Sequence, residues 1–337
     1  MPDGSDAYLF SSYDEESIDL HFKWMRDYDI DGAFMVRFVI AIKDSVWKKQ
    51  INKVMESALK AARKYDRAIS ILYDLSASSQ PEDFSALEND WKELQTLFAV
   101  TDRKQNPTYL WHNNRPLVWI WGVGFRRRTP ASEMQEVIAN FKKDHEVSIM
   151  LGVPFYWRTL TQDAGEDPAL LTLIVSTVDI VQPWSVGRLN MDVYDVRAAE
   201  LSADIQWCRD RQVDYVPCVF PGFSWANLMK NDKYDQIPRL KGDFMWRQVA
   251  GAKAAGASSL FVAMFDEINE GTAIFKCAEE GNLPLLGEGK RFVGIEQGLG
   301  SDYYLWLTGE AAKWFHGNTG YNATKPQRTS DYKLKIN

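Results

Sequence analysis

Short apolar runs alternate with helix-length segments along most of the chain, and this alternation constrains the fold more than any other feature. Seven runs are continuously apolar, which is typical of strands covered by helices on both faces of a parallel sheet. We predict these strands at residues 32–39, 68–73, 116–121, 147–152, 178–182, 215–220 and 259–264. Helices are predicted between and around them, at residues 14–28, 45–64, 83–98, 131–143, 192–211 and 243–255.

Repeated strand–helix units predict right-handed crossovers, and therefore either a doubly wound sheet or a barrel. A dinucleotide-binding sheet would carry a G-x-G-x-x-G loop after a strand. The best candidate, Gly122-Val123-Gly124, lacks the third glycine and is followed by Phe125 and three arginines. We therefore predict an α/β fold of the (β/α)₈ TIM-barrel type.

Seven strands leave this barrel one strand short. Only residues 7–10 precede the first predicted helix with any strand character. Either they form the first strand, or the chain begins after it, and we favour the second interpretation. A missing strand would leave two barrel edges with unpaired backbone groups. We expect one domain over residues 1–337, with an irregular start over 1–13 and a loosely held polar tail over 318–337.

Charge and cysteine content exclude several classes of partner. The 337-residue chain has a formal net charge of −7, which argues against a nucleic acid or an anionic membrane surface as partner. It has no run of 18 apolar residues, so no membrane-spanning segment is predicted. Its three cysteines are too few and too scattered for a disulfide framework or a metal site. We expect a monomer without metal or cofactor.

Aromatic residues are abundant: the chain has 13 Trp, 14 Tyr and 17 Phe. Sugar rings stack on flat aromatic surfaces, so the excess fits a carbohydrate site. It equally fits an aromatic core with surface tryptophans, and composition does not decide between the two.

The candidate site residues follow the predicted strands. In TIM-type barrels the active site lies on the loops after the C-terminal ends of the strands. Nearly every predicted strand ends in aromatic or charged residues, which should converge on one rim. The candidates for substrate binding or catalysis are Asp74, Trp121, Tyr156, Trp157, Arg158, Trp184, Phe223, Trp225, Asp266, Glu267, Asn269 and Glu270.

The segment from Phe265 to Thr272, FDEINEGT, holds three carboxylates within five residues directly after an apolar strand. Such close like charges should raise at least one pKa. A protonated carboxyl beside an ionised one is the pair that glycosidic cleavage uses. The alternatives are a solvated acidic turn and a calcium loop, although the ligand spacing of an EF-hand is missing.

Other polar residues have more specific interpretations, and two of them have two each. Asp74 either bonds a sugar hydroxyl or caps the following turn, and Arg158 either binds substrate or holds a loop. Arg37 lies inside an apolar strand and needs a partner, for which a rim carboxylate such as Asp74 or Glu267 is predicted. His112, before a strand, is predicted to be structural.

The FDEINEGT segment resembles the F-N-E-W-x-E-G-T motif of glycoside hydrolase family 99, the endo-α-mannosidases and endo-α-mannanases. The wider chain resembles bacterial relatives described as xylosidases or arabinosidases. The likeness covers most of residues 8–317 and is carried by residues 18–32, 147–159, 216–228 and 244–276.

This resemblance implies a glycosidase that cleaves an α-linked oligosaccharide or glycan with retention. Glu270 would be the general acid/base. Glu267 would deprotonate the sugar's own 2-hydroxyl, which attacks C1 to give a 1,2-anhydro sugar that water opens. The family also implies a periplasmic or extracellular location, although no signal peptide is visible in the chain.

The chain departs from the family pattern at several positions. Ile268 replaces the motif tryptophan, Asp266 replaces its asparagine, and residues 121–125 replace a strand ending that contains Asp and Tyr. The carboxylate pair therefore transfers, whereas mannose specificity does not. A carbohydrate-binding or glycan-assembly barrel without hydrolysis remains an alternative, as does a sugar lyase or transferase.

Overall fold

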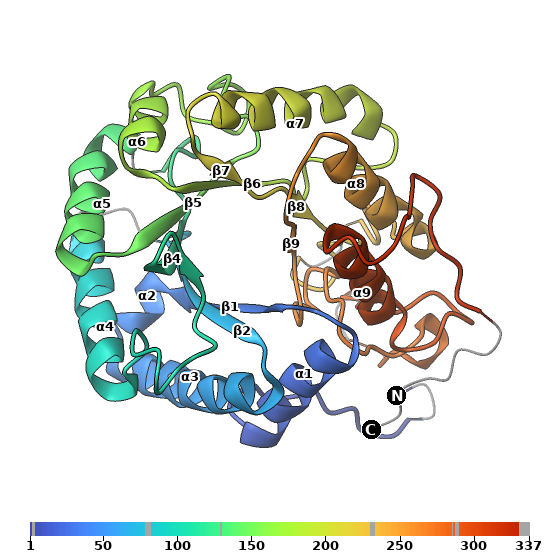
Figure 1. The fold of residues 1–337 in the computed structure, drawn as a ribbon. Helices are drawn as coiled ribbons and strands as arrows, with labels where there is room; N and C mark the ends of the chain where they lie inside the picture. The colour runs from blue at the N-terminus through green and yellow to red at the C-terminus, as the bar shows by residue number, and fades with distance from the viewer. Residues whose placement is uncertain are drawn as a thin grey trace.

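The structure is a computed structural model that describes residues 1, 4–77, 82–128, 130–229, 233–284, 286 and 290–329. A ring of strands is surrounded by helices (Figure 1). The strands are β1 Gly32–Phe38, β2 Ala68–Asp74, β3 Trp111–His112, β4 Arg115–Trp121, β5 Ser148–Pro154, β6 Ile180–Trp184, β7 Asp214–Tyr215, β8 Cys218–Val219 and β9 Phe261–Val262. The helices are α1 Glu15–Asp27, α2 Val39–Ile42, α3 Ser45–Tyr65, α4 Glu82–Phe98, α5 Ala131–His145, α6 Ala169–Thr177, α7 Tyr194–Arg209, α8 Asp243–Ala254 and α9 Tyr303–Phe315, with short 3₁₀ turns at Leu240–Gly242 and Glu280–Asn282.

Apart from the short strand β3, every strand pairing in the ring is parallel. The first sheet has the order β1-β2-β4-β5-β6-β7, and β8 pairs with β9 in a second sheet. The short strand β3 pairs antiparallel with the start of β4. β7 and β8 are two parts of the single strand predicted at 215–220. The predicted α/β barrel of TIM type is thus confirmed.

Residues 7–10 form no strand, and Tyr8 and Leu9 are exposed. No described residues pair β9 with β1, so the backbone ladder is interrupted there. Side chains cross the interruption instead, since the rings of Phe34 on β1 and Phe261 on β9 lie 6.2 Å apart.

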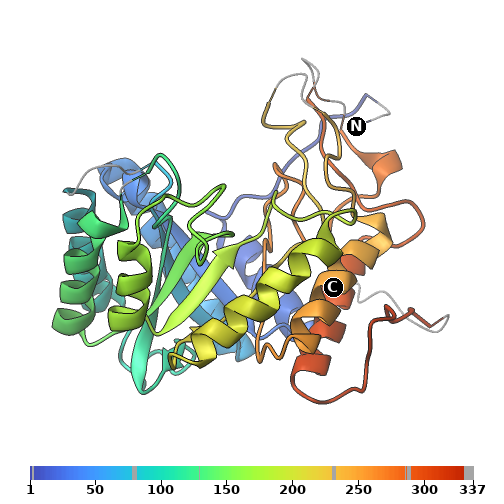
Figure 2. The same cartoon turned by 90° about the horizontal axis from the view of Figure 1, so that it is seen from above.

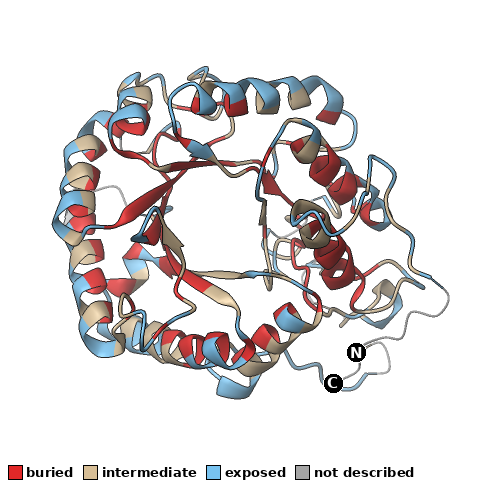
Figure 3. Cartoon of the chain, in the orientation of Figure 1, coloured by how far each residue is buried: buried red, intermediate tan, exposed pale blue. Residues whose placement is uncertain are grey.

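The inside of the barrel is aromatic. Alternate residues of each strand point inward, and Trp119 of β4 lies at the centre with its ring 4.9 Å from Phe34 and 4.7 Å from Phe261. Gly152 of β5 makes room for this cluster, because a Cβ there would lie 2.3 Å from Cδ1 of Trp121. Burial is concentrated on the strands and on the inner faces of the helices (Figure 3).

Arg37 lies on the outer face of β1 and is 1 % exposed. Its Nε and Nη2 donate to Asp90 of α4 at 2.7 and 2.6 Å, and Tyr73 donates to the same carboxylate. The prediction that Arg37 pairs with Asp74 or Glu267 is therefore wrong. Tyr73 is the register partner of Arg37 on β2. Asp74 is one residue further along, and successive strand residues point to opposite faces.

The C-terminal region packs on the barrel through α8 and α9. The indoles of Trp246 and Trp314 stack at 5.5 Å, and Tyr321 packs edge-on against Trp246. Further along the predicted tail, Arg328 forms an ion pair with Asp302 at 2.8 Å. The loops after β8 and β9 extend from one side of the barrel together with the N-terminal segment (Figure 2). Within the described ranges, no helix is long and apolar enough to cross a membrane.

Candidate active site

Neighbouring strand ends bring the first candidate residues together. In the register of the sheet, Phe38 of β1 faces Asp74 of β2, which faces Trp121 of β4. Asp74 and Trp121 share the inward side of their strands with Leu72 and Trp119. Across the barrel, Trp184 at the end of β6 packs edge-on against Trp121 with ring centres 5.4 Å apart. Asp74, Trp121 and Trp184 therefore line one end of the barrel.

The loop after β9 carries the acidic segment in a compact turn. The backbone carbonyl of Glu267 accepts hydrogen bonds from the N–H groups of Thr272 and Ala273, at 3.2 and 3.0 Å. Gly271 has a φ of +64°, which favours glycine at this position. The carbonyl of Glu270 accepts the N–H of Ser224 at 2.8 Å, which ties the turn to the loop after β8. Both glutamates are thus held by backbone contacts.

The electrostatics of this end are dominated by clustered carboxylates. Burial, followed by the charges of Glu267 and Asp74, raises the pKa of Glu270 to about 7. Burial, followed by the charge of Glu267, raises the pKa of Asp266 to about 6. Burial also raises the pKa of Asp74, whose Oδ1 accepts the N–H of Ser76 in the following turn. Glu270 therefore carries a proton below about pH 7 while lying next to two other acidic groups.

Asn269 stabilises the turn after β9 through two hydrogen bonds. Its backbone N–H donates to Oε1 of Glu267 at 2.7 Å. Its side-chain oxygen accepts from Nδ2 of Asn227 at 2.6 Å, which links it to the loop after β8. Asn269 is exposed, and these contacts orient the Glu267 carboxylate.

The remaining aromatic candidates divide into two groups. Phe223 and Trp225, on the loop after β8, pack edge-on at 5.0 Å and belong to the same apolar cluster as Trp184. Tyr156 is 9 % exposed at the end of β5, and the guanidinium of Arg197 lies 5.8 Å from its ring centre.

Trp157 and Arg158 instead contact α7. Trp157 is fully buried, and its indole N–H donates to Asp204 at 2.9 Å. Arg158 donates to Asp204 at 2.6 Å and to Glu200 at 2.9 Å. The structure does not bring these two side chains to the carboxylates of the β9 loop.

One charged residue near the site was not predicted. Arg128, on the loop after β4, has its guanidinium carbon 5.1 Å from the ring centres of both Trp121 and Phe125. The three arginines after Phe125 were visible in the sequence, but nothing in their spacing indicates which one folds back over the tryptophan. Among the described residues, no group of three or more His, Cys, Asp or Glu side chains could hold a metal ion.

No family model matches the chain, and no curated protein sequence matches it. Solved structures do match. The chain is similar to the GH99 endo-α-mannosidase of Bacteroides thetaiotaomicron in complex with bis-tris-propane, with a TM-score of 0.68 and 15 % identity over 92 % of this chain and 86 % of that one. A second structure of the same enzyme has a TM-score of 0.67 and 14 % identity, over 93 % and 82 % of the two chains.

The chain has the fold of glycoside hydrolase family 99. The resemblance seen in the sequence is thus confirmed at the level of the fold, and at 15 % identity the likeness extends no further than the fold. The structural neighbours are glycoside hydrolases, so the carboxylates and tryptophans described above lie on a glycoside hydrolase fold.

Proposed function

We propose that this protein is a retaining glycoside hydrolase that acts on an α-linked glycan. The observation that carries the proposal is Glu270, a half-buried carboxyl on the loop after β9. Its pKa is about 7, raised by burial and by the charges of Glu267 on the same loop and Asp74 at the end of β2. A protein with a family-99 fold and a protonated carboxyl beside a second carboxylate has the two groups that glycosidic cleavage needs.

In the proposed reaction, Glu270 donates its proton to the leaving glycosidic oxygen as the bond from C1 to that oxygen breaks. Glu267 takes the proton of the sugar's 2-hydroxyl, whose oxygen attacks C1 and forms a 1,2-anhydro sugar. Glu270, now ionised, then takes a proton from water as the water attacks C1. The bond from C1 to the 2-oxygen breaks, and this oxygen recovers its proton from Glu267. Two inversions at C1 give net retention.

We propose that the sugars bind against the aromatic and polar side chains at this end of the barrel. Trp121, Trp184, Phe223 and Trp225 are the proposed stacking surfaces, and Asp74 and Asp266 are proposed to bond sugar hydroxyls. Tyr156, Trp157, Arg158 and Asn269 stay predictions as substrate contacts, and their observed partners favour an indirect, supporting role for the last three. A periplasmic or extracellular location is proposed with the activity.

The test is product analysis with α-linked oligosaccharides, beginning with α-mannans because their axial 2-hydroxyl suits the proposed attack. We expect new reducing ends, the α-anomer as the first product seen by proton NMR, and ¹⁸O from labelled water at the anomeric carbon. A β-anomer as first product would refute retention. Glycan binding without new reducing ends would indicate the binding barrel, and an unlabelled or unsaturated product would indicate a transferase or lyase.

The pKa of Glu270 predicts the alkaline limb of the pH profile. The acid must be protonated, so kcat/KM should fall as pH rises through about 7, the value to which burial and the two neighbouring carboxylates raise it. Removing the charge of Asp74 with Asp74→Asn should move this limb to lower pH, because one like charge no longer opposes ionisation. A limb that stays in place in this variant, or that lies near the ordinary glutamate value, would contradict the assignment.

A further inference from the structure

Arg128 occupies an unusual position on the rim. Its backbone N–H donates to the carbonyl of Phe125 at 3.2 Å, which closes the turn after β4 and directs the side chain back over Trp121. Gly122 leaves the space that the guanidinium fills. With a φ of +113°, Gly122 is in a conformation that favours glycine, and a Cβ on it would lie 3.3 Å from Nη1 of Arg128.

The charge of Arg128 has no ion-pair partner among the described residues. Its Nη1 is buried and makes no hydrogen bond to any residue that the structure describes. Asp74 acts on it electrostatically without a direct contact, and burial lowers the pKa of the guanidinium. A buried donor of a charged group is costly to leave unpaired, so a binding partner from outside the chain would be stabilising here.

Neighbouring arginines are satisfied within the protein. Arg126 donates to the carbonyl of Gln162 at 2.8 Å and to Glu166 at 3.1 Å. Arg188, on the loop after β6, pairs with Asp163 at 2.7 Å. Arg128 alone among these three stacks on a tryptophan that faces the barrel end and keeps donors unused. It lies on the loop after β4, whereas Glu267 and Glu270 lie on the loop after β9.

We propose that Arg128 binds an anionic group of a sugar that lies against Trp121 and Arg128, so that the site takes an acidic glycan. This inference rests on the proposed function. The planar guanidinium matches carboxylate and sulfate oxygens in a two-pronged geometry, and its five donors let it bind such a group while it still faces Asp74. The shared chemistry is an anionic oxygen cluster on a sugar ring, supplied either by a uronic acid or by a sulfate ester.

The experiment compares matched neutral and anionic probes. One α-mannan oligosaccharide preparation is used as it is, after oxidation of its primary hydroxyls to carboxylates, and after chemical sulfation. Binding of each probe is measured by calorimetry with the whole chain, with Arg128→Gln, and with Arg115→Gln as control. Arg115 is exposed at the opposite end of β4, so its variant changes the net charge equally without touching the rim.

The proposal expects an anionic probe to bind the native protein at least about tenfold more tightly than the neutral one, the usual weight of a charge-assisted contact. This preference should be lost in Arg128→Gln and kept in Arg115→Gln, with thermal melting confirming that all three proteins are folded. The oxidised and sulfated arms then identify the anion. Equal binding of all probes, no binding of any, or a preference that survives in Arg128→Gln would overturn the inference. Release of reducing ends is scored separately in the same tubes, so loss of the anion preference and loss of hydrolysis are distinguishable.

Discussion

Glu270→Gln should lower kcat/KM by about 10²–10⁴-fold, the usual weight of general acid–base catalysis. The amide keeps the size of the side chain but has no proton to give to the leaving oxygen. Glu270 is held by its backbone contact with Ser224, which glutamine retains, so the position of the group should not change. The measurement is steady-state hydrolysis of the oligosaccharide that the native protein cleaves best.

The leaving group separates an acid from a residue that merely shapes the site. With an aryl glycoside whose phenol is strongly acidic, departure needs no proton, so most of the loss in Glu270→Gln should disappear. Glu267→Gln should be equally impaired with both substrates, since attack by the 2-hydroxyl still lacks its base. Undiminished activity in Glu270→Gln would exclude the acid role.

A matched control is Glu146→Gln. Glu146 is exposed at the C-cap of α5, just before β5 and hence at the other end of the barrel from the β9 loop. The Glu146→Gln variant removes the same charge by the same substitution as Glu270→Gln. Its activity should equal that of the native protein, and a comparable loss there would mean that net charge rather than Glu270 controls the rate.

Most of the ring was predictable because buried parallel strands are continuously apolar, and the runs at β1, β2, β4 and β5 stand out from their flanks. Helix α6 was missed for the same reason. Its sequence, ALLTLIVST, is mostly apolar and mixes leucines with β-branched residues, so it has no charged face that would indicate a helical period. Helix α9 was not predicted either. It contains Gly309, and glycine lowers helix propensity. The structure supplies the reason, since a Cβ there would lie 2.0 Å from the carbonyl oxygen of Tyr28.

The site was predictable to the extent that it lies next to strand ends. The rule that barrel loops converge on one rim brought Asp74, Trp121 and the β9 carboxylates together in the prediction. It could not assign Trp157 and Arg158, because their side chains turn toward α7, nearly fifty residues further along the chain. Nor could it identify Arg128, whose direction depends on the space above Gly122.

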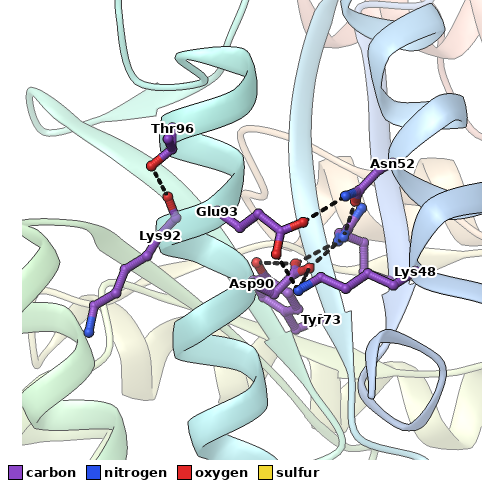
Figure 4. Close-up of polar contacts among 8 residues, drawn as sticks. Lys48, Asn52, Tyr73, Asp90, Lys92, Glu93 and Thr96 are labelled. Atoms are coloured by element: carbon purple, nitrogen blue, oxygen red, sulfur yellow. Dashed lines mark hydrogen bonds and ion pairs between the residues drawn. The ribbon is translucent and has the colours of Figure 1, made fainter. Parts of the chain in front are cut away.

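The partner of Arg37 illustrates the same limit and leads to the largest expected effect on stability. Asp90 lies 53 residues away on α4 and is fully buried. In Figure 4, Asp90 and Glu93 of α4 face Lys48 and Asn52 of α3, with Tyr73 of β2 beside them, while Lys92 points away from this group. Lys48 pairs with Glu93 at 2.5 Å but is 3.8 Å from Asp90, so Arg37 is the main counter-charge of Asp90.

Arg37→Met should therefore lower the free energy of unfolding by about 3–5 kcal/mol, the cost of leaving a buried charge without its partner. Methionine fills part of the space, but it donates nothing to Asp90, which keeps only the Tyr73 hydroxyl at 2.9 Å and the distant lysine. Urea unfolding followed by tryptophan fluorescence measures the change.

Two further variants decide whether the loss comes from the unpaired charge. Arg37→Met combined with Asp90→Leu removes both charges and should recover most of the stability, because no buried ion is then left unpaired. Lys92→Met likewise replaces a cation with methionine, on α4. There the lysine is exposed and pairs with Glu88 at 2.5 Å on the surface, so the variant should change stability little. If the double variant were as unstable as Arg37→Met, the lost packing of the arginine side chain, and not the isolated carboxylate, would account for the effect.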